Sequence, residues 1–300
     1  MDRTITSDAS VSRALFVESG KTLVGVCADN KLRFWDTESG ALRQTVGNEP
    51  LGQPYAFIGS GVQFAGVSKD GKVQLRDMKT ASIVRELPPI MPRAGDIAFS
   101  DDGSRVATAH IIDRQTGVNT IRVRDASGKD LFTVPAGIGG ISTLGFSPDG
   151  STLVASSYDA DLRVWSVRNG ELIKLVEELP VSMFDLSFSP DGKWLAMAGV
   201  DRIVYLWNTK TWKLDRKITG QPEMISALTF SPDGKRIVTG GMSELTVQNP
   251  VKLIVWDVES ARQLKVMPAP HRVTGIAFSQ DGSKFASTYG QKTVHIWQAP

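Results

Sequence analysis

The sequence has little of what usually assigns a protein to a class. Its 300 residues contain one cysteine, Cys27, which excludes a disulfide framework and any zinc site built from cysteines. No stretch approaches the roughly 18 apolar residues of a membrane span, and the polar start from Met1 to Ser10 does not predict a signal peptide. We therefore expect a cytoplasmic protein that does not associate with membranes.

Net charge is also nearly absent. Lys and Arg total 34 against 32 Asp and Glu, which leaves a formal charge of +2. Such a small excess supplies no bulk attraction to phosphates, so no nucleic-acid partner is expected.

What the sequence does contain is a repeat. A short β-branched run ends seven times in an apolar residue, a Trp or Arg, and a polar residue. The intervals between the central residues are 41, 48, 41, 42, 49 and 41. A Phe followed by a turn sequence precedes each copy, most clearly as Phe-Ser-Pro-Asp-Gly at Phe146, Phe188 and Phe230. Two markers that stay in phase through seven copies predict seven structural units. The central residues are Trp35, Arg76, Arg124, Trp165, Trp207, Trp256 and Trp297.

Each unit reads as four short strands, a to d, separated by turns. In the fourth unit these are residues 142–146, 152–156, 161–165 and 172–176, and no helical period is sustained anywhere. Pro-Asp-Gly suits the a–b turn because Pro sets φ, Asp bonds its own backbone and Gly accepts a positive φ. The sequence thus predicts an all-β chain of seven four-stranded antiparallel sheets.

This pattern resembles the WD40-repeat β-propellers, over essentially the whole chain. Literal Trp-Asp occurs only at Trp35-Asp36 and Trp256-Asp257, and the family's Gly-His before strand a is nearly absent. The regular Phe-Ser-Pro-Asp-Gly turns are similar to those of the bacterial branch. The resemblance implies a single seven-bladed propeller, 1–300, that acts as a non-catalytic scaffold. The expected blades are 11–46, 53–87, 94–134, 141–176, 182–218, 225–267, and 273–299 with 2–6.

The last unit lacks its own strand d, because only three residues follow Trp297. The segment Arg3-Thr4-Ile5-Thr6 is similar to Arg216-Lys217-Ile218-Thr219, which reads as strand d of the fifth unit. We therefore predict that residues 2–6 form the outer strand of the last blade, beside residues 295–297. This closure removes an open sheet edge.

Candidate contact residues come from departures from regularity. The third and sixth units are longer by six and seven residues, which places insertions in the b–c loops near 110–119 and 241–251. In such blades the b–c and d–a loops share one face, and we expect a protein or peptide partner there. The alternative is that these loops are neutral and the side chains only pack locally. The candidates are Asp96, His110, Arg114, Tyr158, Phe184, Asp185, Met242, Glu244, Arg272 and Tyr289.

Four aspartates, in contrast, read as structural. Asp29, Asp70, Asp159 and Asp201 each fall in a b–c turn, where a carboxylate bonds nearby backbone.

No catalytic motif is present, and we expect no cofactor, metal or catalytic residues. One alternative remains a propeller enzyme or metal-dependent hydrolase with His110 and His271 above the central channel, accompanied by Asp96 and Asp113. Another is that the propeller is one module of a larger protein. As a scaffold we expect a monomer.

Overall fold

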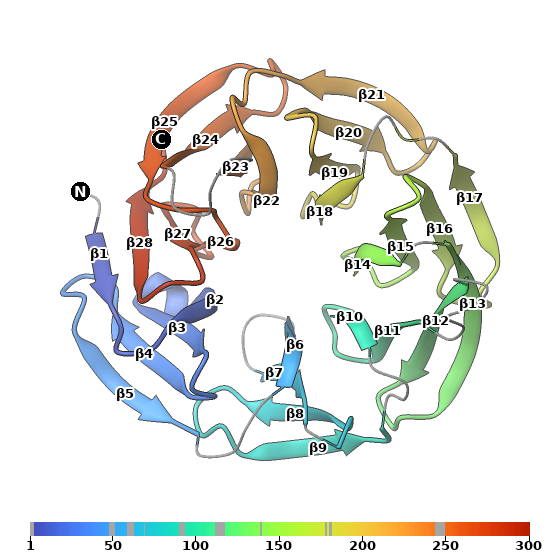
Figure 1. The fold of residues 1–300 in the computed structure, drawn as a ribbon, viewed down its shortest axis with the longest axis horizontal. Coiled ribbons are helices and arrows are strands. Elements are labelled where there is room, and N and C mark those ends of the chain that lie inside the picture. The colour runs from blue at the N-terminus through green and yellow to red at the C-terminus, as the bar shows by residue number, and fades with distance from the viewer. Residues whose placement is uncertain are drawn as a thin grey trace. The chain divides into compact units, whose positions relative to one another are not determined.

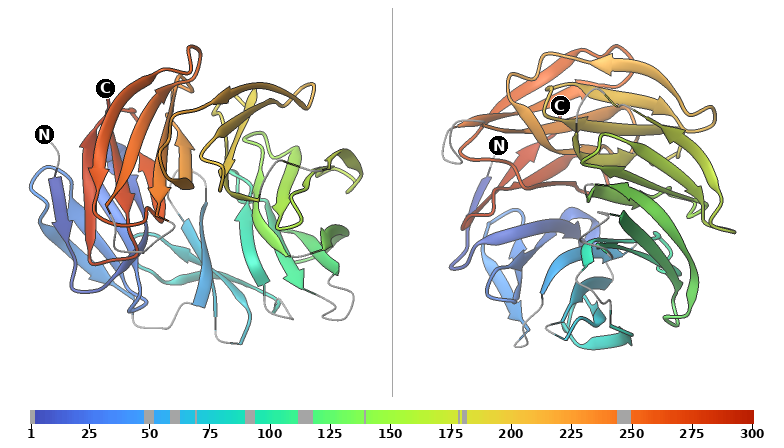
Figure 2. Two further views of the ribbon diagram at one scale, coloured as in Figure 1. Left: turned by 45° about the horizontal axis from the view of Figure 1, so that its top comes forward. Right: turned by 45° about the vertical axis from the view of Figure 1, so that its right-hand side comes forward.

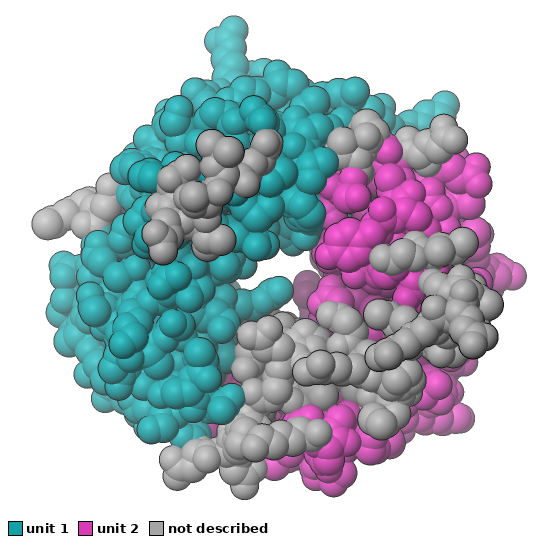
Figure 3. Space-filling model, viewed as in Figure 1, with its two compact units in different colours: residues 1–49, 184–300 teal, residues 50–183 magenta. Residues whose placement is uncertain are grey.

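The computed structural model of the protein describes residues 3–47, 52–58, 63–68, 70–89, 94–111, 118–138, 140–177, 179, 182–243 and 250–300. Its contacts divide the chain into two compact units (Figure 3). Unit 1 comprises Met1–Glu49 and Phe184–Pro300, and unit 2 comprises Pro50–Met183. We number the sheets as blades 1 to 7 along the chain.

Unit 2 holds blades 2, 3 and 4, each a four-stranded antiparallel sheet in chain order (Figure 1). Blade 2 contains β6 (Gly52–Ile58), β7 (Gln63–Val67), β8 (Val73–Asp77) and β9 (Ile83–Leu87). Blade 3 contains β10 (Ala94–Phe99), β11 (Arg105–Ile111), β12 (Val118–Asp125) and β13 (Asp130–Ile138). Blade 4 contains β14 (Ile141–Phe146), β15 (Thr152–Ser157), β16 (Leu162–Ser166) and β17 (Leu172–Val176).

Unit 1 holds the other four blades, and the fold class predicted from the sequence is confirmed. Blade 1 contains β2 (Val11–Val17), β3 (Thr22–Cys27), β4 (Leu32–Asp36) and β5 (Leu42–Val46). Blade 5 contains β18 (Met183–Phe188), β19 (Trp194–Gly199), β20 (Val204–Asn208) and β21 (Lys213–Ile218). Blade 6 contains β22 (Met224–Phe230), β23 (Arg236–Met242), β24 (Val251–Asp257) and β25 (Gln263–Ala269). Blade 7 contains β26 (Gly275–Phe278), β27 (Lys284–Thr288), β28 (Thr293–Gln298) and β1 (Arg3–Thr6).

The N-terminal strand completes blade 7, as the sequence predicts. The N-terminal strand β1 lies beside the C-terminal strands (Figure 2) and runs antiparallel to β28. The register pairs Arg3 with Ile296 and Thr6 with Thr293. The side chain of Ile5 is 1 % exposed and packs in a core that also holds Leu23 and Trp35 of blade 1. One apolar residue therefore joins the sheet that β1 completes to the blade that follows it.

The hydrophobic cores lie between successive blades. In unit 1, Leu206 and Ile218 of blade 5 pack with Ile254 and Trp256 of blade 6. In unit 2, residues of blade 3 such as Ile121 pack in the same way with Trp165 of blade 4. Because a narrow sheet exposes two apolar faces, each blade is stabilised by the one that covers it.

The a–b turns carry a repeated hydrogen-bond pattern. In blade 4 the Ser147 hydroxyl donates to Asp149 Oδ1 over 2.6 Å and accepts the Thr152 backbone N–H over 3.0 Å. Gly150, with a φ of 67°, donates its N–H to the Ser147 carbonyl over 2.8 Å. Hydrogen bonds from the turn lower the pKa of these aspartates, in the case of Asp191 to about 2, with the Ser189 hydroxyl as the largest cause. The same Ser–Asp pairing occurs at Ser100–Asp102, Ser189–Asp191, Ser231–Asp233 and Ser279–Asp281.

A cation on the outer strand joins each of several blades to the next. Its side chain donates a hydrogen bond of 2.6–2.9 Å to a backbone carbonyl of the next blade. The acceptor lies at the end of strand c or in the turn that follows this strand. Because the acceptor is a backbone oxygen, the bond does not depend on the side chain there. The four pairs are Arg3 with Ser39, Arg85 with Ala126, Arg216 with Glu259, and Lys265 with Gln298.

Truncating the buried anchor of β1 should weaken closure. We expect Ile5→Ala to reduce the free energy of unfolding by about 3 kcal/mol, because a buried Ile is replaced by a cavity. Deletion of residues 1–8 should lower the melting temperature by many degrees, because β28 is left as an open edge. Calorimetry measures both, with Thr4→Ala on the exposed side of β1 as control. Unchanged melting in the truncated protein would contradict this closure.

The turn aspartates should make stability depend on pH in the acid range. Because the folded pKa of Asp191 is about 2, below its usual value of 3.8, its contribution is present above about pH 4 and is lost as the pH falls towards 2. The difference in urea midpoint between the wild type and Asp191→Asn should therefore shrink across that interval. A difference that stays constant from neutral pH to about pH 2 would be inconsistent with this assignment.

Candidate functional site

The two longer units differ from the others in their sheets, not only in their loops. In blade 3, β12 has 8 residues and β13 has 9, whereas β16 and β17 of blade 4 have 5 each. In blade 6, β24 and β25 have 7 residues each. The added pairs include Val118 with Ile138 and Val251 with Ala269. Both sheets are thus extended at the end where strands b and c are joined, which we call the b–c end.

Four of the candidates, His110, Arg114, Met242 and Glu244, lie in the predicted insertions near 110–119 and 241–251. Arg114, Glu244 and the possible companion Asp113 fall outside the described residues. Met242, which ends β23, is half-buried and pairs with Met224.

Tyr158 is an exposed aromatic residue at the b–c end of its blade. It follows β15 at the b–c end of blade 4, and 56 % of it is accessible to solvent. Its backbone N–H donates to the Gly140 carbonyl over 3.0 Å, and its ring lies over Gly140. Backbone anchoring holds this residue in place while its ring faces solvent, as in an aromatic contact residue.

Arg163 joins blade 4 to the extended strand β13 of blade 3. Its guanidinium donates to the Ala136 carbonyl over 3.2 Å and to Asp161 over 2.7 Å. A Cβ at Gly137 would lie 2.4 Å from the same guanidinium, and Gly137 has a φ of 94°. The close approach of the Arg163 guanidinium therefore explains why position 137 is a glycine.

Asp96 and Asp185 link successive blades through their backbones. Asp96 accepts the N–H of the next residue over 2.9 Å and that of Leu144, in β14 of the following blade, over 3.2 Å. Asp185 accepts the N–H of Leu228, in β22 of the following blade, over 2.9 Å. Each carboxylate thus satisfies an N–H of the neighbouring strand a that would otherwise have no partner in a sheet.

His110 and Tyr289 are buried. His110 is 3 % exposed and its Nε2 lies 2.7 Å from the Thr108 hydroxyl. Tyr289 is 2 % exposed, its hydroxyl lies 2.6 Å from the Ser287 hydroxyl and 3.1 Å from His295 Nδ1, and burial raises its pKa. Both side chains therefore take part in the interior of their blades.

Phe184 and Arg272 complete the candidate set. Phe184 is half-buried in β18, and Arg272 is exposed in the segment between β25 and β26. Tyr158 in unit 2 and Arg272 in unit 1 are therefore the candidates whose side chains are exposed among the described residues.

The four b–c turn aspartates bond within their own blades. Asp29 holds Arg33 in a two-point ion pair at 2.8 and 2.6 Å, and this hydrogen bond lowers the pKa of Asp29. Asp201 accepts the Tyr205 hydroxyl over 2.5 Å. Asp70 and Asp159 accept the hydroxyls of Ser68 and Ser157.

Buried hydrogen-bond chains end at two of the strand c tryptophans. In blade 6, Trp256 Nε1 donates to the Thr239 hydroxyl over 2.8 Å, and Thr239 donates to Gln221 Oε1 over 2.7 Å. In blade 7, Trp297 Nε1 donates to the Ser287 hydroxyl over 2.9 Å. Gln221 and the Tyr289–His295 pair thus stand at the far end of these chains, where the sequence lacks the family's Gly-His.

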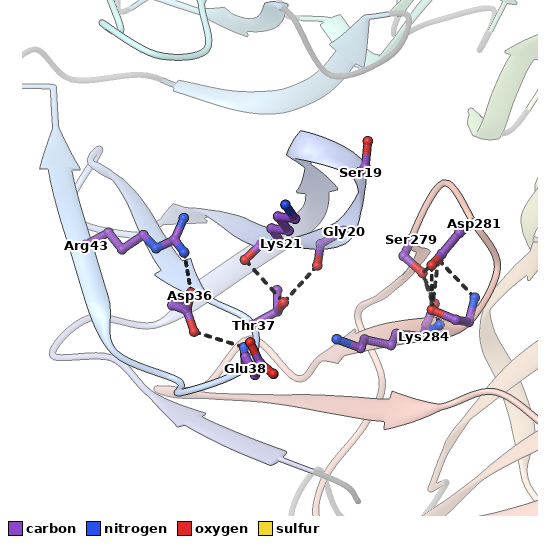
Figure 4. Close-up of a pocket in the computed structure, with 11 residues that line it drawn as sticks. Ser19, Gly20, Lys21, Asp36, Thr37, Glu38, Arg43, Ser279, Asp281 and Lys284 are labelled. Carbon is purple, nitrogen blue, oxygen red and sulfur yellow. Dashed lines mark hydrogen bonds and ion pairs between the residues drawn. The ribbon is translucent and has the colours of Figure 1, made fainter.

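A polar pocket of about 360 Å³ lies at the opposite, turn-bearing end of unit 1, between blades 7 and 1 (Figure 4). Asp36 pairs with Arg43 there, and Thr37 donates to the Gly20 carbonyl over 2.7 Å. Hydrogen bonds from Ser39 are the largest cause of the lowered pKa of Asp36, and those from Ser279 have the same effect on Asp281. Both acids are therefore ionised and hold their own turns.

In the described part of the chain, no group of three or more His, Cys, Asp or Glu side chains could hold a metal ion. None of the helices in that part is long and apolar enough to cross a membrane.

The outer-strand cations were missed by the sequence reasoning. A signal existed, because Arg85, Arg216 and Lys265 each follow the central residue of strand c by nine positions (85 − 76, 216 − 207, 265 − 256). Trp212, in the c–d turn of blade 5, is only 9 % exposed.

Removing the hydroxyl of Thr239 should destabilise blade 6. In Thr239→Val the Trp256 N–H and the Gln221 oxygen are left buried without this partner, at a cost of about 2 kcal/mol. Thr239→Ser keeps the hydroxyl and should remain within about 1 kcal/mol of the wild type. Urea denaturation followed by tryptophan fluorescence compares the two, and equal losses would show that the hydroxyl is unimportant.

Comparison with known proteins supports the repeat assignment. The family model described as WD domain, G-beta repeat matches residues 128–166, 176–208, 212–244 and 261–298. A WD repeat-containing protein SL1-17 of Schistosoma mansoni is 26 % identical over 146 residues, covering 48 % of this chain and 46 % of that protein. The Autophagy-related protein 16 of Arabidopsis thaliana is 24 % identical over 166 residues, covering 53 % of this chain and 31 % of that protein.

The matched part is less than half the length of either relative. Three of the four family matches end just after Trp165, Trp207 and Trp297, at the marker that defines the repeat. The repeat spacing, the four-stranded blades and the family model therefore agree, and the chain belongs to the WD40-repeat proteins.

Proposed function

We propose that the chain is a non-catalytic scaffold that binds a protein or peptide partner at the b–c ends of its blades. WD40 membership supports an interaction scaffold in general. The observation that carries the choice of face is the extension of blades 3 and 6, whose strands c and d are lengthened towards this end.

Rigidity supports the same proposal. Tyr158 is fixed by a backbone bond to Gly140, and Arg163 fastens the extended β13 to the next blade. Side chains whose backbone is held by such bonds lose little conformational freedom on binding, so more of the contact energy appears as affinity.

Tyr158 and Arg272 are the proposed contacts that a partner can reach in units 2 and 1. An exposed aromatic ring and an exposed guanidinium are the side-chain types most often found in interface hot spots. Asp96, Asp185, His110 and Tyr289 support this end through their bonds within and between blades.

The test starts from affinity capture in the native organism, followed by direct titration of each captured protein. We expect Tyr158→Ala or Arg272→Ala to weaken binding by about tenfold, the loss of one moderate hot spot, without lowering the melting temperature. Lys210→Ala, an exposed residue of a c–d turn, serves as control. A partner that binds both variants normally but loses affinity for Lys210→Ala would place the interface at the opposite end.

A further inference from the structure

The outer strand of blade 4 is an unusually apolar sheet edge. In the described part of the chain, β17 pairs only with β16, so its other edge presents backbone N–H and C=O groups. Leu172 and Ile173 are 51 % and 49 % exposed and lie at the β-bulge where the register with β16 shifts between Val164 and Trp165. Two adjacent apolar side chains are therefore exposed to solvent at this edge.

The other outer strands are protected in ways that β17 is not. Prolines interrupt β13 and β25 at Pro135 and Pro268, and proline cannot donate to an added strand. Strand β21 carries four charged residues among its six, and β1 has only four residues. Strand β9 contains the charged pair Arg85-Glu86, and β5 contains the polar run Arg43-Gln44-Thr45. In β17 the sole charged residue is Lys174, with four apolar residues around it. Its edge therefore has the fewest barriers to strand addition.

Charges at the ends of β17 indicate what can pair with it. Glu171 and Glu177 flank the strand and are exposed, and Lys174 is exposed at its centre. None of the three side chains forms an ion pair among the described residues. A complementary strand would carry basic residues at its ends and an acidic residue in the middle, because opposite charges across a ladder stabilise pairing.

A second copy of this chain fits less well. Antiparallel self-pairing with full overlap would set Lys174 opposite Lys174, and Glu171 opposite Glu177 of the other copy. Like charges directly opposite each other destabilise a ladder. The charge pattern therefore favours a different sequence as the added strand.

We propose that the edge of β17 accepts an extended segment of a partner protein, with alternating apolar residues and basic ends, which adds to blade 4 as a fifth strand. Main-chain hydrogen bonds provide the pairing, while Leu172, Ile173 and the two glutamates select the sequence. This surface is separate from the b–c ends and does not depend on the function proposed for them.

The probe is a synthetic peptide of alternating valine and threonine with a lysine at each end and a central glutamate. Its counterpart exchanges the charges, with glutamates at the ends and a central lysine. Fluorescence anisotropy measures binding, and amide hydrogen exchange locates it. We expect the first peptide to bind and to slow exchange in Leu172–Val176, and the second to bind at least several-fold more weakly.

Substitutions then test the assignment. Ile173→Thr should weaken the first peptide by about tenfold through lost apolar burial. Leu264→Thr is the matched control, because Leu264 occupies the same position in β25 and is 48 % exposed, and it should have no effect. Reversing both glutamates to lysine should make the protein prefer the charge-exchanged peptide.

Several results would overturn the proposal. These are no binding of either peptide, equal binding of both, or equal losses in the Ile173 and Leu264 variants. Self-association in sedimentation experiments that Ile173→Thr abolishes would assign the edge to a second copy instead. Tyr158→Ala should leave peptide binding intact, so failure here and failure of the b–c interface are distinguishable.

Discussion

The structure depends on the mutual covering of narrow sheets. A blade of four short strands has two faces, and its inner strands are apolar on both: all six residues of β3 are buried. Such a sheet cannot be stable alone in water, because one face would remain exposed. The cores are therefore shared, as Leu206 of blade 5 and Ile254 of blade 6 illustrate. Outer-strand cations such as Arg216 fasten the periphery of the same interfaces.

The sequence predicted the fold in detail because the same pattern of strands and turns occurs seven times. The Phe-to-Trp spacing sets strands b and c, and the Ser-Pro-Asp-Gly turns have one favourable conformation, so element positions were confirmed closely in blade 4. The similarity of Arg3–Thr6 to Arg216–Thr219 also identified the closing strand, since both place an isoleucine at one buried position. Patterns that recur can be read from a single sequence.

The candidate site was less accessible to sequence reasoning, because exposure at a strand end depends on neighbours distant in the chain. Tyr158 and Tyr289 occupy similar places in the sequence, yet one is exposed and the other is buried with His295. Likewise Asp96 bonds a backbone group 48 residues away, which no local pattern encodes. Other residues also make hydrogen bonds where the family's Gly-His is missing: Gln221 bonds to Thr239 in blade 6, and Tyr289 bonds to Ser287 in blade 7. In blade 5, Met197 stands where blade 6 has Thr239, and Trp207 Nε1 is buried without a partner in the described part of the chain.

The pairing of β1 with β28 also constrains how the protein can form on the ribosome. Arg3 precedes its partner Ile296 by 293 positions (296 − 3), so the two residues are synthesised far apart in time. Earlier blades can assemble from neighbouring hairpins while synthesis continues, but the strand from Arg3 to Thr6 must wait unpaired until β28 has emerged. During that interval Ile5 is exposed, and blade 1 lacks the cover that blade 7 later supplies. The slowest and most vulnerable step in forming the propeller is therefore expected to be the pairing of β1 with β28.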